Sequence, residues 1–154
     1  MNISIVLQLT FIYIVTMTTK KKQTDLLRRH GIQPSIQRLA IADHVLNSDS
    51  HPTADEIFQA VSETLPVVSR ATVYNTLRLF MEKGLVSAYK LEDGPTVYDA
   101  NTQKHHHLID ADSDTVIDIP WEAVELQDVP ELADYDIVSC TVIIRGRKRT
   151  ISED

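Results

Sequence analysis

Apolar side chains recur every three or four residues through the first half of the chain, which is the spacing of amphipathic helices. The pattern predicts a helix that ends before Gly31 and a second helix that begins at Ser35. A third helix is predicted to begin at Thr53, because Thr53 and Glu56 have the spacing of a capping box. A fourth helix is predicted over residues 69–84.

Two short apolar runs follow the fourth helix. Residues 85–90 and 96–98 flank the turn Glu-Asp-Gly at 92–94, and this arrangement predicts a β-hairpin. A winged helix-turn-helix has this order of elements, with helices followed by a hairpin. In that fold the last helix enters the major groove, and the hairpin can contact the DNA backbone.

The fourth helix has an apolar side and a polar side. At about 100° per residue, the apolar side consists of Val73, Leu77 and Phe80. On or beside the polar side, Arg70 can meet phosphate or guanine, Tyr74 can contact a thymine methyl group or phosphate, and Asn75 can bind adenine. A solvated surface helix has the same two sides, so the helix alone leaves that alternative open. The order of the elements and the local charge favour DNA.

Charge divides the chain into two parts. The 154 residues carry a net charge of −7, but residues 17–90 hold 10 Lys and Arg against 7 Asp and Glu, whereas residues 91–154 hold 5 against 15. A mildly basic part followed by a strongly acidic part indicates two modules with different partners. With 43% hydrophobic and 24% charged residues, the composition is that of a globular protein and argues against general disorder.

The first sixteen residues form a separate segment, with eleven apolar and no charged side chains. No basic residue precedes the apolar stretch and no small-residue cleavage site follows it, so a secretory signal fits badly. The segment is also shorter than the roughly 20 residues of a membrane-spanning helix. The preferred interpretation is an over-extended start, with the functional protein beginning near Met17. An extra packing element and a membrane anchor are the alternatives.

Three consecutive histidines precede a β pattern over residues 115–119. If this segment is a strand, His105 and His107 point to one face and His106 points to the other. Two convergent imidazoles indicate a metal site, but a solvated polar turn is an equally simple explanation of the triplet alone.

Other potential ligands lie at a distance in the sequence. Asp99 precedes the triplet by six residues, Asp118 lies on the next predicted strand, and His51 lies at the start of the third helix. Three histidines and two aspartates offer only nitrogen and oxygen donors. Such a set suits Fe²⁺, Mn²⁺ or Zn²⁺ better than Cu(I) or an iron–sulfur cluster.

Several strings resemble the ferric uptake regulator (Fur) superfamily of metal-dependent bacterial repressors. They are S-H-P-T-A-D-E-I-F at 50–58, S-R-A-T-V-Y-N-T-L-R at 69–78, V-Y-D at 97–99, H-H-H-L-I at 105–109 and V-I-D-I at 116–119. The resemblance extends from about Lys20 to Arg149. It implies an α+β protein, with an N-terminal winged helix-turn-helix domain followed by a small C-terminal α/β dimerisation domain.

The resemblance also implies a division of the chain. The DNA-binding domain is expected at 17–98, a hinge at 99–104, and a dimerisation and metal-sensing domain at 105–149, with an apolar extension at 1–16 and a tail at 150–154. The family's regulatory metal, Fe²⁺ or Mn²⁺, has five ligands, and their positions match His51, Asp99, His105, His107 and Asp118.

Two positions resemble the peroxide-sensing PerR branch of the superfamily. They are Asp118, where iron sensors usually have Glu, and Asn75 after Tyr74. In that branch Fe²⁺ in the site reacts with peroxide, a ligand histidine is oxidised, and the repressor leaves DNA. The oxidation-sensitive positions match His51 and His105.

The implied protein is a cytoplasmic homodimeric repressor on a palindromic double-stranded operator, with no membrane association and no enzymatic activity. The residues expected to contact DNA are Arg38, Arg70, Thr72, Tyr74, Asn75 and Arg78. The alternatives are an iron- or manganese-sensing repressor of the same superfamily without a peroxide response and, in a different class, a small non-haem metalloenzyme.

The chain departs from the family pattern at the structural zinc, which two C-x-x-C pairs usually hold. The first pair would fall at Asp110 and Ser113, and the one cysteine of the chain is Cys140, so no four-cysteine zinc can form within the chain. The dimer is therefore expected to rest on packing and sheet pairing. Cys140 is expected to be buried in a last strand over residues 137–144.

Overall fold

The computed structural model describes residues 19–48, 50–91, 94–125, 134–138 and 140–149. The chain divides into two compact units, Met1–Thr102 and Gln103–Asp154. The division falls inside the expected hinge at 99–104, whose role as a hinge stays a prediction. The apolar extension and the tail lie outside the described residues. None of the helices in the described ranges is long and apolar enough to span a bilayer.

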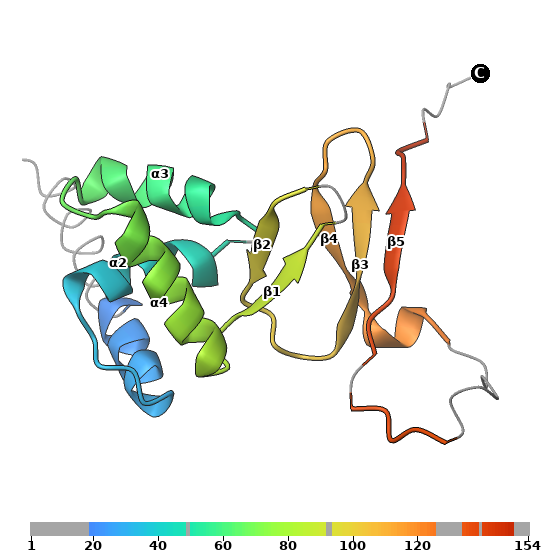
Figure 1. The fold of residues 1–154 in the computed structure, drawn as a ribbon, viewed down its shortest axis with the longest axis horizontal. Helices are drawn as coiled ribbons and strands as arrows, with labels where there is room; N and C mark the ends of the chain where they lie inside the picture. Colours follow the sequence, from blue (N-terminus) through green and yellow to red (C-terminus); the bar gives the residue numbers. More distant parts are fainter. Residues whose placement is uncertain (1–18, 49, 92–93, 126–133, 139, 150–154) are drawn as a thin grey trace, which may run out of the picture. The chain divides into compact units, whose positions relative to one another are not determined.

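Four helices make up most of the described part of the N-terminal unit (Figure 1). They are a helix over residues 19–29, α2 (Ile36–Leu46), α3 (Ala54–Thr64) and α4 (Arg70–Glu82). The last three helices each begin directly after an N-cap residue. The hydroxyls of Ser35, Thr53 and Ser69 each accept a hydrogen bond from the backbone N–H three residues further on. The capping box of Thr53 and Glu56 is formed in both directions, as the sequence predicts.

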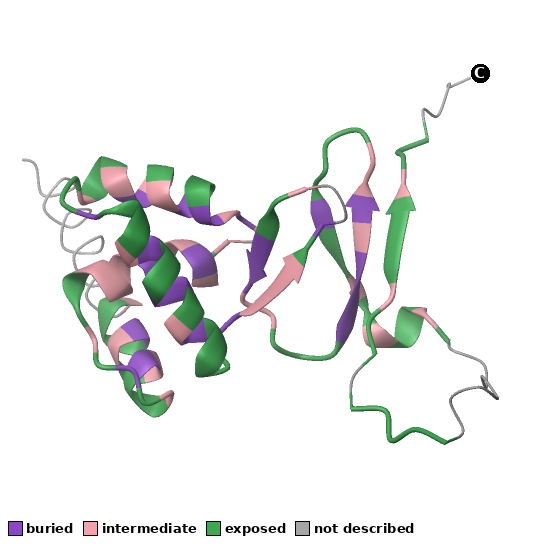
Figure 2. Ribbon diagram, viewed as in Figure 1, coloured by how far each residue is buried: buried purple, intermediate pink, exposed green. Residues whose placement is uncertain are grey.

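The core of this unit lies between the helices, where Figure 2 shows the buried faces of α2, α3 and α4. The predicted stripe of α4 is confirmed, since Val73, Leu77 and Phe80 have no exposed surface. They pack with other buried apolar side chains, among them Leu27, Ile41, Val45, Ile57, Val61 and Leu85. Gly84 follows α4 with a φ of +65°, a conformation that glycine adopts without strain.

A hairpin completes the N-terminal unit. Its strands are β1 (Ser87–Lys90) and β2 (Thr96–Asp99), which pair antiparallel. Strand β2 is also tied to the segment before α3, because Thr53 forms an antiparallel bridge with Val97 and the Tyr98 N–H donates to the Pro52 carbonyl at 2.9 Å. The helices and this wing form the winged helix-turn-helix that the sequence predicts.

The C-terminal unit is built on a three-stranded sheet in the order β4-β3-β5 (Figure 1). The central strand β3 (His105–Asp110) pairs antiparallel with β4 (Val116–Pro120) and parallel with β5 (Ile143–Gly146). A short 3-10 helix, η1 (Trp121–Ala123), follows β4. The histidine triplet therefore lies on a strand, and the alternative of a solvated turn is wrong.

The prediction for Cys140 is also wrong. Cys140 is exposed and lies outside β5, which begins only at Ile143. A segment rich in β-branched residues forms a strand only where a neighbouring strand offers hydrogen bonds, and β3 pairs with β5 from His107↔Ile143 onward. One residue earlier, the Val142 N–H already donates to a side chain, that of His106, at 3.1 Å.

Candidate metal centre and DNA-contact surface

In the N-terminal unit the local pairing brings His51 beside Asp99. Because the antiparallel bridge joins Thr53 to Val97, residues 51 and 99 come opposite each other when the same register is continued. The His51 Nε2 lies 3.7 Å from Asp99 Oδ1, and each side chain is only 5% exposed. Asp99 also accepts a hydrogen bond from the Asn101 N–H at 2.6 Å, which fixes its carboxylate at the end of β2.

In the C-terminal unit three potential ligands converge on one face of the sheet. His107 of β3 is the direct antiparallel partner of Asp118 on β4, and His105 lies two residues along on the same face. The two Nε2 atoms are 2.8 Å apart, and Asp118 Oδ1 is 3.7 Å from His105 Nε2 and 3.9 Å from His107 Nε2. The sequence prediction that His105 and His107 share a face is confirmed.

Hydrogen bonds to the backbone set the tautomers of two neighbouring histidines. His105 Nδ1 lies 2.7 Å from the Gln103 carbonyl oxygen. A carbonyl can only accept, so Nδ1 carries the proton and Nε2 keeps its lone pair toward His107 and Asp118. His106 has the opposite tautomer, because its Nδ1 accepts a hydrogen bond from the Val142 N–H at 3.1 Å and therefore carries no proton. His105 thus directs the lone pair of Nε2 toward the other potential ligands, whereas the lone pair of His106 is on Nδ1 and accepts from the backbone.

The opposite face of β3 has an aromatic layer rather than a ligand set. The ring of His106, which is fully buried, stacks on Trp121 with 4.5 Å between centroids and 24° between planes. The Lys104 ammonium lies 5.5 Å from the centroid of the Trp121 ring. This layer holds the strand in place and leaves the other face of β3 to His105 and His107.

The nitrogen-to-oxygen distances within each unit match donors that share an ion. Two donor atoms bound to one metal at about 2.1 Å lie about 3 to 4 Å from each other. The N···O separations are 3.7 Å between His51 and Asp99 and 3.7 and 3.9 Å from Asp118 to the two imidazoles. These are too long for good hydrogen bonds and suitable for a common cation. Within each unit, the residue types and their spacing therefore fit a divalent metal.

The predicted DNA-contact residues of α4 lie mostly at its surface. Arg70, Tyr74, Asn75 and Arg78 are exposed, and Thr72 is half-buried. The Arg78 guanidinium lies 3.5 Å from Asn75 Oδ1 and 3.9 Å from Glu82 Oε1, so its pairings are local. On α2, the half-buried Arg38 donates to the Gln33 carbonyl at 2.7 Å.

Tyr74 of the helix also affects the wing. Burial raises the pKa of the Tyr98 phenol on β2, and the negative charge of an ionised Tyr74 would raise that pKa further. The Tyr98 phenol is therefore neutral at physiological pH, while 49% of Tyr74 remains exposed.

Sequence reasoning missed two features of this region. Asp55 contacts the guanidinium of Arg70, although the two residues are fifteen positions apart. Trp121 contacts the middle histidine of the triplet. Neither pairing has a local spacing signal, since both depend on how separate elements pack.

Comparison with known proteins gives a consistent result. The sequence profile of the Ferric uptake regulator family matches residues 29–145. The peroxide-responsive repressor PerR of Staphylococcus epidermidis is 36% identical over 132 residues, covering 83% of this chain and 87% of that protein.

Solved structures show the same fold. The Vibrio cholerae ferric uptake regulator (Fur) has a TM-score of 0.62 at 26% identity, covering 81% of this chain and 98% of that one. The Campylobacter jejuni peroxide stress regulator has a TM-score of 0.58 at 19% identity, covering 86% and 97%, which is a likeness of fold alone.

Proposed function

Because the chain belongs to the ferric uptake regulator family, we propose that it is a metal-dependent transcriptional repressor that senses peroxide. The observation that carries the proposal is the convergence of His105, His107 and Asp118 on one face of the sheet. The likeness to the staphylococcal PerR protein supports the peroxide response.

One ion is proposed to take ligands from both units. His51 and Asp99 belong to the winged helix, whereas His105, His107 and Asp118 belong to the C-terminal sheet. Asp99 and His105 are only six positions apart, so even a fully extended chain would hold their Cα atoms within about 20 Å. Five nitrogen and oxygen donors suit Fe²⁺ or Mn²⁺, with the lone pair of His105 Nε2 already directed into the site.

The proposed switch follows from this division of ligands. An ion that binds all five side chains favours the arrangement of the two units in which they meet, and shifts the population toward it. In a homodimer, that arrangement would set the distance between two copies of α4, and so their match to the half-sites of a palindromic operator. The proposed contacts to this DNA come from Arg38, Arg70, Thr72, Tyr74, Asn75 and Arg78, in a cytoplasmic protein.

The peroxide response is proposed to act on the ligands themselves. Bound Fe²⁺ would supply the redox chemistry toward hydrogen peroxide. Insertion of one oxygen atom from peroxide into a carbon–hydrogen bond of the His51 or His105 ring leaves one water. An oxidised ring is a poorer ligand, so the population returns to the form that does not bind the operator.

The test is an operator-binding titration with Fe²⁺ and with Mn²⁺, before and after dilute peroxide, combined with mass spectrometry. Both metals should support binding before peroxide, and only the iron form should lose binding and gain the mass of one oxygen atom on His51 or His105. His105→Ala should abolish metal-dependent binding with far-UV circular dichroism unchanged. Iron protein that binds DNA unmodified after peroxide would make the chain a plain metal sensor. Operator affinity that is the same with and without metal would refute the proposed metal-dependent switch.

A further inference from the structure

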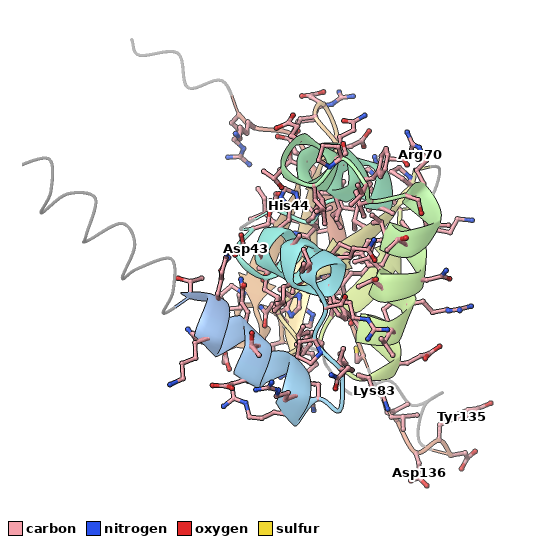
Figure 3. The ribbon with its side chains drawn as sticks, turned by 90° about the vertical axis from the view of Figure 1, so that its left-hand side faces the viewer. Asp43, His44, Arg70, Lys83, Tyr135 and Asp136 are labelled. Carbon is pink, nitrogen blue, oxygen red and sulfur yellow. The ribbon has the colours of Figure 1, made fainter. Side chains whose placement is uncertain are left out.

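Arg70, the first residue of α4, has its guanidinium folded back onto α3 (Figure 3). Its Nη1 contacts Oδ1 of Asp55. Its Cζ lies 4.6 Å from the centroid of the Phe58 ring. One edge of the guanidinium is therefore held by a carboxylate and one face by an aromatic ring, at the start of the helix that is proposed to enter the major groove.

Asp55 and DNA compete for the same donors. An arginine fork fits a carboxylate and a phosphate in the same way, through parallel N–H groups. The side chains of Arg70 and Asp55 are 55% and 56% exposed, so a phosphate can reach the pair. To bind Arg70 through Nη1, DNA has to displace Asp55, and the freed carboxylate then repels the backbone that displaced it.

The neighbouring acid has a different role. Glu56 accepts hydrogen bonds from the Thr53 N–H at 2.7 Å and from the Thr53 hydroxyl at 2.8 Å, and so closes the cap of α3. A change at Asp55 leaves this cap in place. The pairing with Arg70 can therefore be removed without removing the start of the helix.

We propose that Asp55 is a specificity-determining residue, which withholds Arg70 from DNA that offers only phosphates. DNA of random sequence is bound mainly through its phosphates, which are the same at every position. A DNA sequence that also forms base-edge contacts elsewhere along α4 gains enough binding free energy to displace Asp55 from Arg70. The inference rests on the proposed DNA-contact role of Arg70, and it adds a residue of α3 that opposes that contact.

The test compares D55N with D25N in the full-length protein, on random-sequence duplex and on an operator selected from a random pool. Both variants remove one negative charge, but Asp25 pairs with Arg28 at 3.8 Å on the helix over residues 19–29. D55N should bind random duplex about 3- to 10-fold more tightly than D25N, with the slope of log affinity against log salt steeper by about 0.9, the value for one further phosphate. The ratio of operator to random-duplex affinity should fall several-fold in D55N alone.

A double-mutant cycle with Arg70 removes ambiguity. In R70A, which loses the competing group, the effect of D55N on random duplex should shrink to that of removing one negative charge, as D25N does. If R70A does not fold, R70K takes its place in the cycle. R70K keeps the positive charge but lacks the guanidinium fork, so the effect of D55N on random-duplex affinity should be smaller in R70K than in the wild type. The inference is overturned if D55N behaves as D25N does on random duplex, or if the excess of D55N over D25N persists undiminished in R70A. Because the random-duplex arm needs neither an operator nor a metal switch, loss of metal-dependent operator binding in the wild type would refute only the proposed function.

Discussion

The two units bury different kinds of side chain. The apolar cluster that runs from Leu27 to Tyr98 lies wholly in the N-terminal unit. In the described part of the C-terminal unit, the buried residues are His105, His106, His107, Ile109 and Val116. The winged helix thus has an apolar core of its own, whereas the centre of the sheet is largely imidazole.

This difference indicates where each unit obtains its stability. Burying apolar area contributes about 25 cal/mol per Å², and it does so without a ligand. Buried imidazoles contribute only when their nitrogens are satisfied, by hydrogen bonds or by a metal. We therefore expect the stability of the N-terminal unit to be largely independent of metal and the C-terminal unit, once folded, to be stabilised further by it.

The largest effect is expected from opening the apolar core. Phe80→Ala removes a fully buried ring and should lower the free energy of unfolding of the N-terminal unit by about 3 to 5 kcal/mol. Urea denaturation followed by far-UV circular dichroism measures this, with excess Mn²⁺ and with chelator. The loss should be the same in both. Met81→Ala, at a neighbouring residue that is 42% exposed, is the control and should have a small effect. A Phe80→Ala loss that Mn²⁺ reverses would contradict the separation of the two units.

Metal removal is expected to have the next largest effect, and on the other unit. The single tryptophan, Trp121, stacks on His106, so its fluorescence reports the C-terminal unit. Mn²⁺ at about 100 times its Kd should stabilise that unit by about 2.7 kcal/mol, and a chelator should reverse the gain. His107→Ala should abolish the gain, whereas His44→Ala on α2 should retain it. A fluorescence transition that does not respond to Mn²⁺ in the wild type would show that the imidazole layer is stable without a cation.

The cap of α3 provides a smaller polar contribution to the N-terminal unit. Thr53→Ala removes the acceptor for the Glu56 N–H and should lower the free energy of unfolding by about 1 kcal/mol. Thr53→Ser keeps the hydroxyl and should retain most of the stability. Urea titration with and without Mn²⁺ measures both. If Thr53→Ala and Thr53→Ser lower the free energy of unfolding equally, the loss comes from the threonine methyl group and not from the hydroxyl cap.

The smallest effect is expected where the sheet is joined by surface charges. The loop after β3 meets the end of β5 through the Ala111 N–H, which donates to Gly146 at 2.8 Å, and through two ion pairs, Arg147 with Asp112 at 3.1 Å and Arg145 with Asp114 at 3.6 Å. The Arg147 and Asp112 side chains are 74% and 66% exposed.

A double-mutant cycle of Arg147→Ala and Asp112→Ala should therefore give a coupling below about 1 kcal/mol, measured by Trp121 fluorescence. One molar salt should remove that coupling. A coupling above about 2 kcal/mol that salt does not weaken would make this junction a principal support of the sheet.

Local rules were sufficient for the N-terminal unit. Helix starts follow from hydroxyl caps at Ser35, Thr53 and Ser69, and the buried side of α4 follows from the helical period, because each depends on residues three or four positions apart. The face shared by His105 and His107 follows in the same way from the strand period of two.

The remaining features depend on contacts between distant segments. Cys140 belongs to a sequence with strand character, yet the neighbouring strand pairs only from Ile143 onward. The pairing of Asp55 with Arg70 and the stacking of His106 on Trp121 join separate elements in the same way. No spacing rule within one element contains such information, whereas the resemblance to a known family supplied the grouping of the five proposed metal ligands.

A single cation is proposed to take ligands from both units, and manganese binding to three proteins, the wild type and two variants, is the decisive measurement. Electron paramagnetic resonance should detect one tightly bound Mn²⁺ per wild-type chain. His51→Ala, in the winged helix, and His107→Ala, in the sheet, should each weaken that binding by at least about tenfold, with far-UV circular dichroism unchanged. Wild-type affinity in His51→Ala would confine the site to the C-terminal unit and contradict the account.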